Sequence, residues 1–122
     1  MTALIIAGGR DFGDYDYLKL WCDCITRKMG NDITVISGHA KGADQLGEKY
    51  AKERDLKLEI FPADWDTYGT KAGPIRNKQM AERALEFPNQ RLIAFWDCTS
   101  RGTKNMITTA NQYSMPTNII FY

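Results

Sequence analysis

The stretch VISGHAKGADQLGEKYA, residues 35–51, passes from an apolar run through a loop of small residues into a segment with helical spacing. The apolar run ends at Ser37, Gly38 and Gly42 mark the loop, and Ala43 and Asp44 open the helical segment. A strand that turns through glycines straight into a helix is typical of a parallel βαβ unit. We therefore expect a parallel sheet covered by helices.

The same alternation runs along the whole chain. Five short apolar runs occupy residues 3–7, 33–36, 58–61, 92–96 and 118–121. Each run is nearly continuous, which is typical of strands covered on both faces. Four segments with helical period lie between them; the first carries the stripe of Leu18, Cys22, Ile25 and Met29.

This order predicts an α/β fold with a single Rossmann-like domain over residues 1–122. It is a three-layer sandwich around a five-stranded parallel sheet. We expect the strand order 3-2-1-4-5, with the flavodoxin-like order 2-1-3-4-5 as the alternative. Residues 62–72 are expected to form a long loop, followed by a helix with Gly73 as its N-cap and Pro74 in its first turn.

Composition narrows the class of protein. The length of 122 residues suits one domain, and the net charge of +1 argues against a broad nucleic-acid surface. The odd cysteine count, with Cys22, Cys24 and Cys98, indicates reduced thiols, and the N-terminal apolar run is too short for a signal or membrane segment. We expect a cytoplasmic protein with no membrane partner, no cofactor and no metal.

A homodimer is expected from the first helical segment. Tyr15, Tyr17, Trp21 and Ile25 spread over a wide arc there. This arc is more apolar surface than one sheet face needs.

Ligands of open α/β sheets bind outside the carboxyl ends of the strands. A loop that enters a helix there presents free N–H groups at the positive end of the helix dipole, which favours an anion such as phosphate. The chain has two such loops, and arginines can add bidentate phosphate contacts. The candidate ligand-binding residues are Gly8, Gly9, Arg10, Asp11, Ser37, Gly38, Gly42, Ala43, Asp44, Trp65, Arg76, Asn77, Asp97, Ser100, Arg101, Gly102 and Thr103.

Within this set, several residues have an expected role and an alternative one. Trp65, or Tyr68 nearby, suits stacking on a base, or else a lid or a subunit contact. Asp97 suits a bond to a ribose hydroxyl, or else caps the next turn. His39 is expected to be a turn residue with positive φ. The chain contains neither G-x-G-x-x-G nor G-x-x-x-x-G-K-[ST], so an NAD-type or P-loop site is not supported.

The segments GGRDF, SGHAKGAD, PADWDTYGTKAGPIRNKQM and SRGTKNMI together resemble the YspA-like branch of the SLOG superfamily. The likeness runs from Ala3 to Ile120. It implies a Rossmann-like domain that binds nucleotides or nucleotide-derived ligands, as a sensor or a processing module. The related LOG enzymes cleave the N-glycosidic bond of nucleoside 5′-monophosphates. Their phosphate loop would align with residues 99–103 here, and their active-site arginine with Arg76.

The sequence departs from the LOG pattern at two places. Cys98, Thr99 and Ser100 stand where Pro and Gly begin the phosphate loop, and Asn105 replaces the glutamate two residues after Gly-Thr. Glycosidic cleavage passes through an oxocarbenium-like state that a carboxylate stabilises. An N-glycosidase would then need another carboxylate.

Three functions stay open on the sequence. The first is binding of a nucleotide-type small molecule without catalysis. The second is an N-glycosidase whose catalytic residues would be Arg76, Asp97 and Asp44, with Asp11 as a further candidate acid. The third is a nucleic-acid or protein interaction module, by analogy with the DprA/Smf proteins, and fold analogy alone is a weak basis for it.

Overall fold

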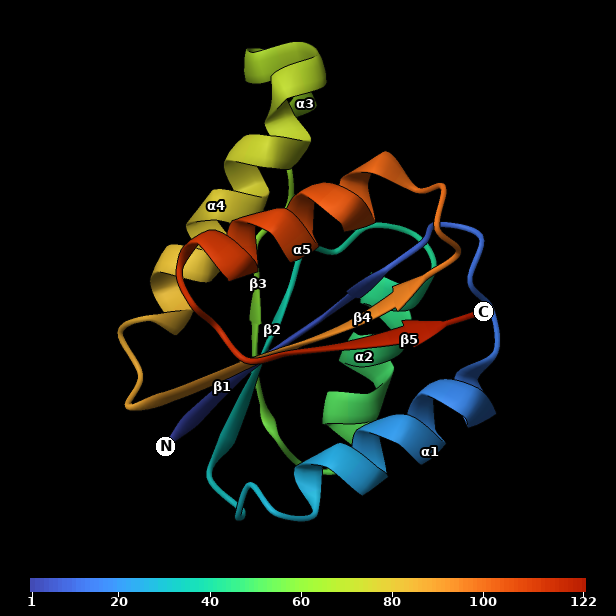
Figure 1. Ribbon diagram of the computed structural model, residues 1–122, viewed down its shortest axis with the longest axis vertical. Coiled ribbons are helices and arrows are strands. Elements are labelled where there is room, and N and C mark those ends of the chain that lie inside the picture. Colours follow the sequence, from blue (N-terminus) through green and yellow to red (C-terminus); the bar gives the residue numbers. More distant parts are fainter.

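A computed structural model describes all residues, 1–122, as one α/β domain. The parallel strands are β1 (Thr2–Gly8), β2 (Ile33–Ser37), β3 (Lys57–Ile60), β4 (Asn89–Trp96) and β5 (Thr117–Phe121). The helices are α1 (Tyr15–Thr26), α2 (Ala43–Glu53), α3 (Trp65–Tyr68), α4 (Ala72–Ala84) and α5 (Arg101–Gln112), with a 3₁₀ turn η1 at Gly69–Lys71. Figure 1 shows the sheet in the middle, α1 and α2 on one side and α4 and α5 on the other.

The strand order is β3-β2-β1-β4-β5 and every pair is parallel, which confirms the expected order and excludes the flavodoxin-like alternative. β1 is central, pairing with β2 from Thr2 opposite Ile33 and with β4 from Thr2 opposite Asn89. From β1 the chain adds β2 and β3 on one side of the sheet, and it then crosses over to add β4 and β5 on the other side. The switch point of the topology therefore lies between β1 and β4. In such sheets that is the place where a ligand crevice forms.

Two apolar layers hold the helices against the sheet. Successive strand residues point to opposite faces, so Ile5 packs with the α4 and α5 layer while Ile6 packs with the α1 and α2 layer. Both side chains are fully buried. This explains why the strands read as continuous apolar runs.

The expected loop at residues 62–72 is wrong, because it contains helical turns. Asp64 accepts a hydrogen bond from the Thr67 N–H at 3.1 Å and so caps α3. The 3₁₀ turn η1 then leads directly into α4, which begins at Ala72 with Lys71 as its N-cap. Gly73 therefore lies inside the helix, and Pro74 remains in the first turn, where its missing N–H costs nothing.

The first helix uses part of its apolar arc within the chain. Tyr17 packs against Phe12 and Phe95, and its hydroxyl donates to the Phe121 carbonyl. The Tyr15 hydroxyl donates to Glu53. Trp21 remains exposed. A homodimer stays a prediction, which sedimentation of the purified chain would test.

None of the helices is both long enough and apolar enough to cross a membrane.

Candidate functional site

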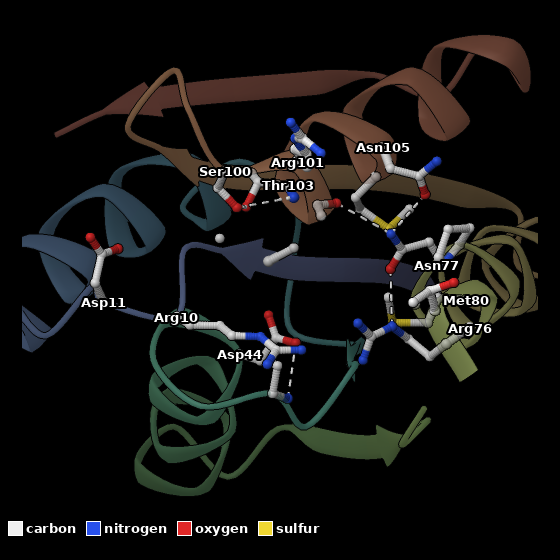
Figure 2. A pocket seen from close by; sticks show the side chains of 18 of the residues that line it. Arg10, Asp11, Asp44, Arg76, Asn77, Met80, Ser100, Arg101, Thr103 and Asn105 are labelled. Carbon is white, nitrogen blue, oxygen red and sulfur yellow. Dashed lines mark hydrogen bonds between the residues drawn. The ribbon is translucent and has the colours of Figure 1, made fainter. Parts of the chain in front are cut away.

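A cleft of about 570 Å³ opens at the carboxyl edge of the sheet, a size usual for small-molecule sites. Its walls come from the ends of β1 and β4, from the loop before α2, from α3 and α4, and from the first two turns of α5. Figure 2 shows ten of the lining residues with labels. The structure brings most of the predicted residues together there: Gly8, Arg10, Asp11, Asp44, Trp65, Arg76, Asn77, Asp97, Ser100, Arg101, Gly102 and Thr103.

Five predicted residues lie outside the cleft, behind its wall. Gly9, Gly42 and Ala43 join the start of α2 to the loop after β1, where the Ala43 N–H donates to the Gly9 carbonyl at 3.2 Å. Gly42 has φ +88°, and a side chain there would overlap the backbone of Gly9 and Arg10. Ser37 and Gly38 also stand outside this cleft. Gly9, Gly42 and Ala43 thus hold the start of α2 against the loop after β1 and do not themselves face the cleft.

Ser37 is fully buried, and its hydroxyl donates to Glu48 Oε2 at 2.7 Å. The other partner of Glu48 is His39, whose Nδ1 lies 2.9 Å from the same oxygen. His39 has the predicted positive φ, at +60°. This chain of contacts fixes the shape of the loop before α2, on the side away from the cleft.

Arg76 on α4 is the most buried cation of the cleft, with 9% of its surface exposed. Its guanidinium donates to the Gly38 carbonyl and to Asn77 Oδ1, and it forms no ion pair with any carboxylate. Burial lowers its pKa, the nearby Asp44 opposes that effect, and Arg10 adds to it. A buried charge without an opposite charge is costly in a folded protein. Arg76 therefore has the capacity to pair with an anion.

Asn77 links the two helices that face the cleft. Its side-chain nitrogen donates to Asn105 Oδ1 at 2.9 Å and to the Gly102 carbonyl at 3.3 Å, while its oxygen accepts from Arg76 at 3.0 Å. Figure 2 shows Arg76, Asn77 and Asn105 at one end of the cleft. Asn105, the residue in place of the LOG glutamate, is thus engaged in orienting Asn77.

Asp44 lies at the start of α2 with 4% of its surface exposed. Its Oδ2 accepts a hydrogen bond from the Ala40 N–H at 3.1 Å. Burial raises the pKa of this carboxyl to about 6, although Arg76 and the Ala40 hydrogen bond act in the opposite direction. Asp44 can therefore gain or lose a proton near neutral pH.

The first turn of α5 presents backbone N–H groups to the cleft. Of the predicted phosphate loop at residues 99–103, Thr99 and Ser100 precede the helix and Arg101, Gly102 and Thr103 lie in its first turn. Ser100 is the N-cap, and its hydroxyl accepts a hydrogen bond from the Thr103 N–H. No protein group accepts from the N–H of Arg101 or Gly102, and both residues line the cleft. Two free N–H groups at the positive end of a twelve-residue helix can bind an anion.

Asp97 shapes the turn before α5. Its Oδ1 accepts from the N–H groups of Thr99 and Ser100 at 2.9 and 2.8 Å, and these bonds lower the pKa of the carboxyl. At neutral pH Asp97 is therefore a carboxylate. Asp97 thus caps the turn before α5, which is the alternative role expected from the sequence, and it also lines the cleft.

Arg10 and Trp65 form the outer rim. The Arg10 guanidinium lies over the Trp65 ring, 5.5 Å from its centre, and 47% of the Trp65 surface is exposed. Tyr68, its expected alternative, does not line the cleft. Asp11, the residue after Arg10, accepts a hydrogen bond at its Oδ1 from the Tyr122 hydroxyl at 2.6 Å.

Sequence reasoning missed several lining residues: Ala7, Ala40, Thr70, Gly73, Pro74, Met80, Asn105 and Met106. For Met80 the signal was present, because it stands on the same helical stripe as Gly73, Arg76 and Asn77. Its apolar character indicates the core equally well, and Met80 is indeed part of the core, with 1% of its surface exposed. No three of the His, Cys, Asp and Glu side chains gather closely enough to hold a metal ion.

Fold and cleft together define a Rossmann-like α/β domain with a polar cleft at the carboxyl edge of its sheet. A family model described as YspA, cpYpsA-related SLOG matches residues 2–68, and the chain belongs to this family. It is 31% identical to the gene 61 protein of Mycobacterium phage D29 over 123 residues, which cover 91% of this chain and 96% of that protein.

A solved structure is similar in fold. It is the DNA processing protein A (DprA) of Streptococcus pneumoniae, with a TM-score of 0.52 and 14% sequence identity. The match covers 96% of this chain, which spans 58% of that protein's length. At this level of identity the similarity concerns the fold alone.

Proposed function

We propose that the chain binds a nucleotide or nucleotide-derived ligand in the cleft, as a sensor or a processing module. The observation that carries this proposal is Arg76, a buried cation that lines the cleft and has no carboxylate partner. An anionic ligand would supply the missing charge, and a guanidinium matches the geometry of phosphate oxygens.

The remaining walls suit the other parts of a nucleotide. The free N–H groups of Arg101 and Gly102 would hold a phosphate at the start of α5. The exposed face of Trp65 would stack on a base. Asp97 or Asp44 would accept a hydrogen bond from a ribose hydroxyl. These roles rest on the chemistry of the lining residues and on the nucleotide ligands that the resemblance implies.

The experiment compares Arg76→Ala with Arg76→Lys and with the control Arg27→Ala. Arg27 is exposed at the end of α1, away from the cleft. Ligand-observed proton NMR would follow a panel of nucleoside mono- and diphosphates, nicotinamide dinucleotide and cyclic nucleotides. We expect the wild type and Arg27→Ala to bind equally, Arg76→Lys to bind more weakly, and Arg76→Ala to lose about tenfold or more in affinity. Equal affinity of all four proteins would contradict the proposal.

One observation favours a second function, an N-glycosidase. Asp44 is a buried carboxyl of the cleft whose pKa of about 6 suits general acid or base chemistry near neutral pH. In this reaction water adds to the ribose carbon as the C–N bond breaks, releasing the free base and ribose 5-phosphate. Asp44 would stabilise the oxocarbenium-like state or accept a proton from water. It would thus take the role of the LOG glutamate, whose position is occupied by Asn105 in this chain.

The test is the appearance of free-base signals over hours in the same NMR samples. Release that disappears in Asp44→Asn and persists in Asp11→Asn would support this function. Intact ligand signals in the wild type would leave binding alone. Unchanged release in the Asp44, Asp97 and Asp11 to Asn variants would contradict a role for these carboxylates.

A further inference from the structure

A second cavity adjoins the cleft on the far side of Arg10, Trp65 and Arg76. This lateral pocket has a volume of about 260 Å³ and lies between the loop before α2 and the segment before α3. Arg10, Ala40, Trp65 and Arg76 line both cavities, and Lys41 and Pro62 line the lateral pocket alone. The side chains of Arg10, Trp65 and Arg76 thus form a partition that both cavities share.

The two cavities differ in charge. The main cleft contains Asp11, Asp44 and Asp97 beside its arginines, so its charges nearly balance. The lateral pocket is lined by three cations, Arg10, Lys41 and Arg76, and by no carboxylate. Asp11 and Asp44 lie close by in the chain, but they line the main cleft, and Asp44 accepts a hydrogen bond from the Ala40 N–H. Asp64, the first acid after Ala63, caps α3. The lateral pocket is therefore the more strongly positive of the two.

None of these cations has an ion-pair partner in the protein. Arg10 is held over Trp65, and its charge lowers the pKa of Arg76. Like charges held close together destabilise one another, and a bound anion removes that repulsion. The unpaired cations that line the lateral pocket therefore favour the binding of an anion.

We propose that the lateral pocket is a second anion subsite, and that the ligand is a nucleotide with a further phosphate beyond the one held at α5. The class comprises nucleoside diphosphates and nucleotides that carry a diphosphate bridge. This inference rests on the proposed function, because the nucleotide would occupy the main cleft. Arg10 and Arg76, facing both cavities, would contact the phosphate chain where it passes the partition.

Lys41 provides the test, because it is exposed and lines only the lateral pocket. Its matched control is Lys78, an exposed lysine on α4 that lines neither cavity. The affinities of AMP, ADP and a nucleoside-diphosphate sugar, and of their guanine counterparts, would be measured by calorimetry at about 0.1 M salt. We expect Lys41→Ala to weaken the diphosphate ligands about fivefold and to leave the monophosphates unchanged. Lys78→Ala should change neither.

Inorganic pyrophosphate separates this inference from the proposed function. Added to ¹⁵N-labelled protein, it should shift the amide signals of Ala40 and Lys41, and Lys41→Ala should weaken its binding. If pyrophosphate shifts these signals while no nucleotide binds, the subsite stands and the proposed function fails. If nucleotides bind but Lys41→Ala weakens mono- and diphosphates equally, or neither, the subsite is contradicted and the proposed function stands. A stronger response to ADP than to the diphosphate sugar would select the free diphosphate as the ligand.

Discussion

Arg76 donates a hydrogen bond to the carbonyl oxygen of Gly38, and the absence of a side chain at position 38 makes this contact possible. A Cβ atom there would overlap the guanidinium and would lie 2.8 Å from Asp44 Oδ2. The backbone of the loop before α2 thus sets the position of the buried cation on α4. The main charges of the cleft depend on one glycine that does not itself line it.

The variant Gly38→Ala should therefore weaken the site although it replaces no residue that lines the main cleft. The added methyl group must displace Arg76 or the loop, and such overpacking costs about 1–3 kcal/mol of stability. We expect a lower denaturation midpoint and at least about a tenfold loss of nucleotide affinity. Gly13→Ala is the matched control, because a Cβ at that exposed position meets nothing within 4 Å. Equal behaviour of the two variants would show that Gly38 does not place Arg76.

Asp44 should give the protein a distinctive pH dependence. Its pKa is about 6 in the folded state and 3.8 when unperturbed. Between these values the folded protein keeps a proton that the unfolded chain has lost, so stability falls as pH rises through this window and levels off above about pH 6. The difference corresponds to about 3 kcal/mol.

Urea unfolding of the wild type and Asp44→Asn, from about pH 4 to about pH 7, measures this contribution. The asparagine keeps an oxygen for the Ala40 N–H and does not titrate. The free-energy difference should move in favour of Asp44→Asn by up to about 3 kcal/mol as pH rises. Acids outside this site cancel in the comparison. A difference that is independent of pH would contradict the raised pKa.

Two helical glycines should respond to alanine in opposite ways. Gly47 in α2 faces the sheet, and a Cβ there would lie 2.8 Å from Ile6 Cγ2, whereas a Cβ at Gly102 in α5 meets nothing within 4 Å. Alanine favours a helix over glycine by about 1 kcal/mol. Thermal unfolding should therefore show Gly102→Ala slightly stabilised, and Gly47→Ala destabilised by about 1–3 kcal/mol. Stabilisation of both would mean that α2 can move away from the sheet.

Trp65 should contribute to nucleotide affinity and little to stability. Stacking on an aromatic ring contributes about 1–3 kcal/mol per base, and nearly half of the Trp65 surface is exposed. We expect Trp65→Ala to weaken nucleotide binding about fivefold or more, with an unchanged thermal midpoint, and Trp65→Phe to restore most of the affinity. Tyr68→Ala, three residues away and outside the cleft, is the control. A stronger effect of Tyr68→Ala would show that the base stacks on Tyr68 and would contradict the role of Trp65.

The fold was predictable because its determinants are local and repeated. Continuous apolar runs such as LIIA and LIAF indicate strands covered on both faces, and four helical stripes between them leave few topologies. The helical turns at Trp65–Lys71 were not predicted, because Asp64 and Gly69 resemble loop residues and the segment has too few apolar positions for a periodic signal. Capping by Asp64 forms the turn without burying any residue of α3.

The position of the site on the sheet was predictable from the sequence, but the orientation of its residues was less so. Residues at strand ends converge on one edge of the sheet, which placed Arg10, Asp97 and Arg101 together in advance. The sequence gives no sign of which side of a loop faces inward, so Ser37 and Ala43 were included with the cleft although they pack behind it. Asn105 was noted only as a departure, because its role depends on a contact with Asn77 on another helix.

The most direct test of nucleotide binding in this cleft is amide chemical-shift mapping of the ¹⁵N-labelled protein with the tightest nucleotide of the panel. We predict that the largest changes appear at the Arg101 and Gly102 amides and at the Arg76 side-chain N–H, and that Arg76→Ala greatly weakens them. Changes confined to the exposed surface of α1, or the same response in Arg76→Ala, would contradict the account.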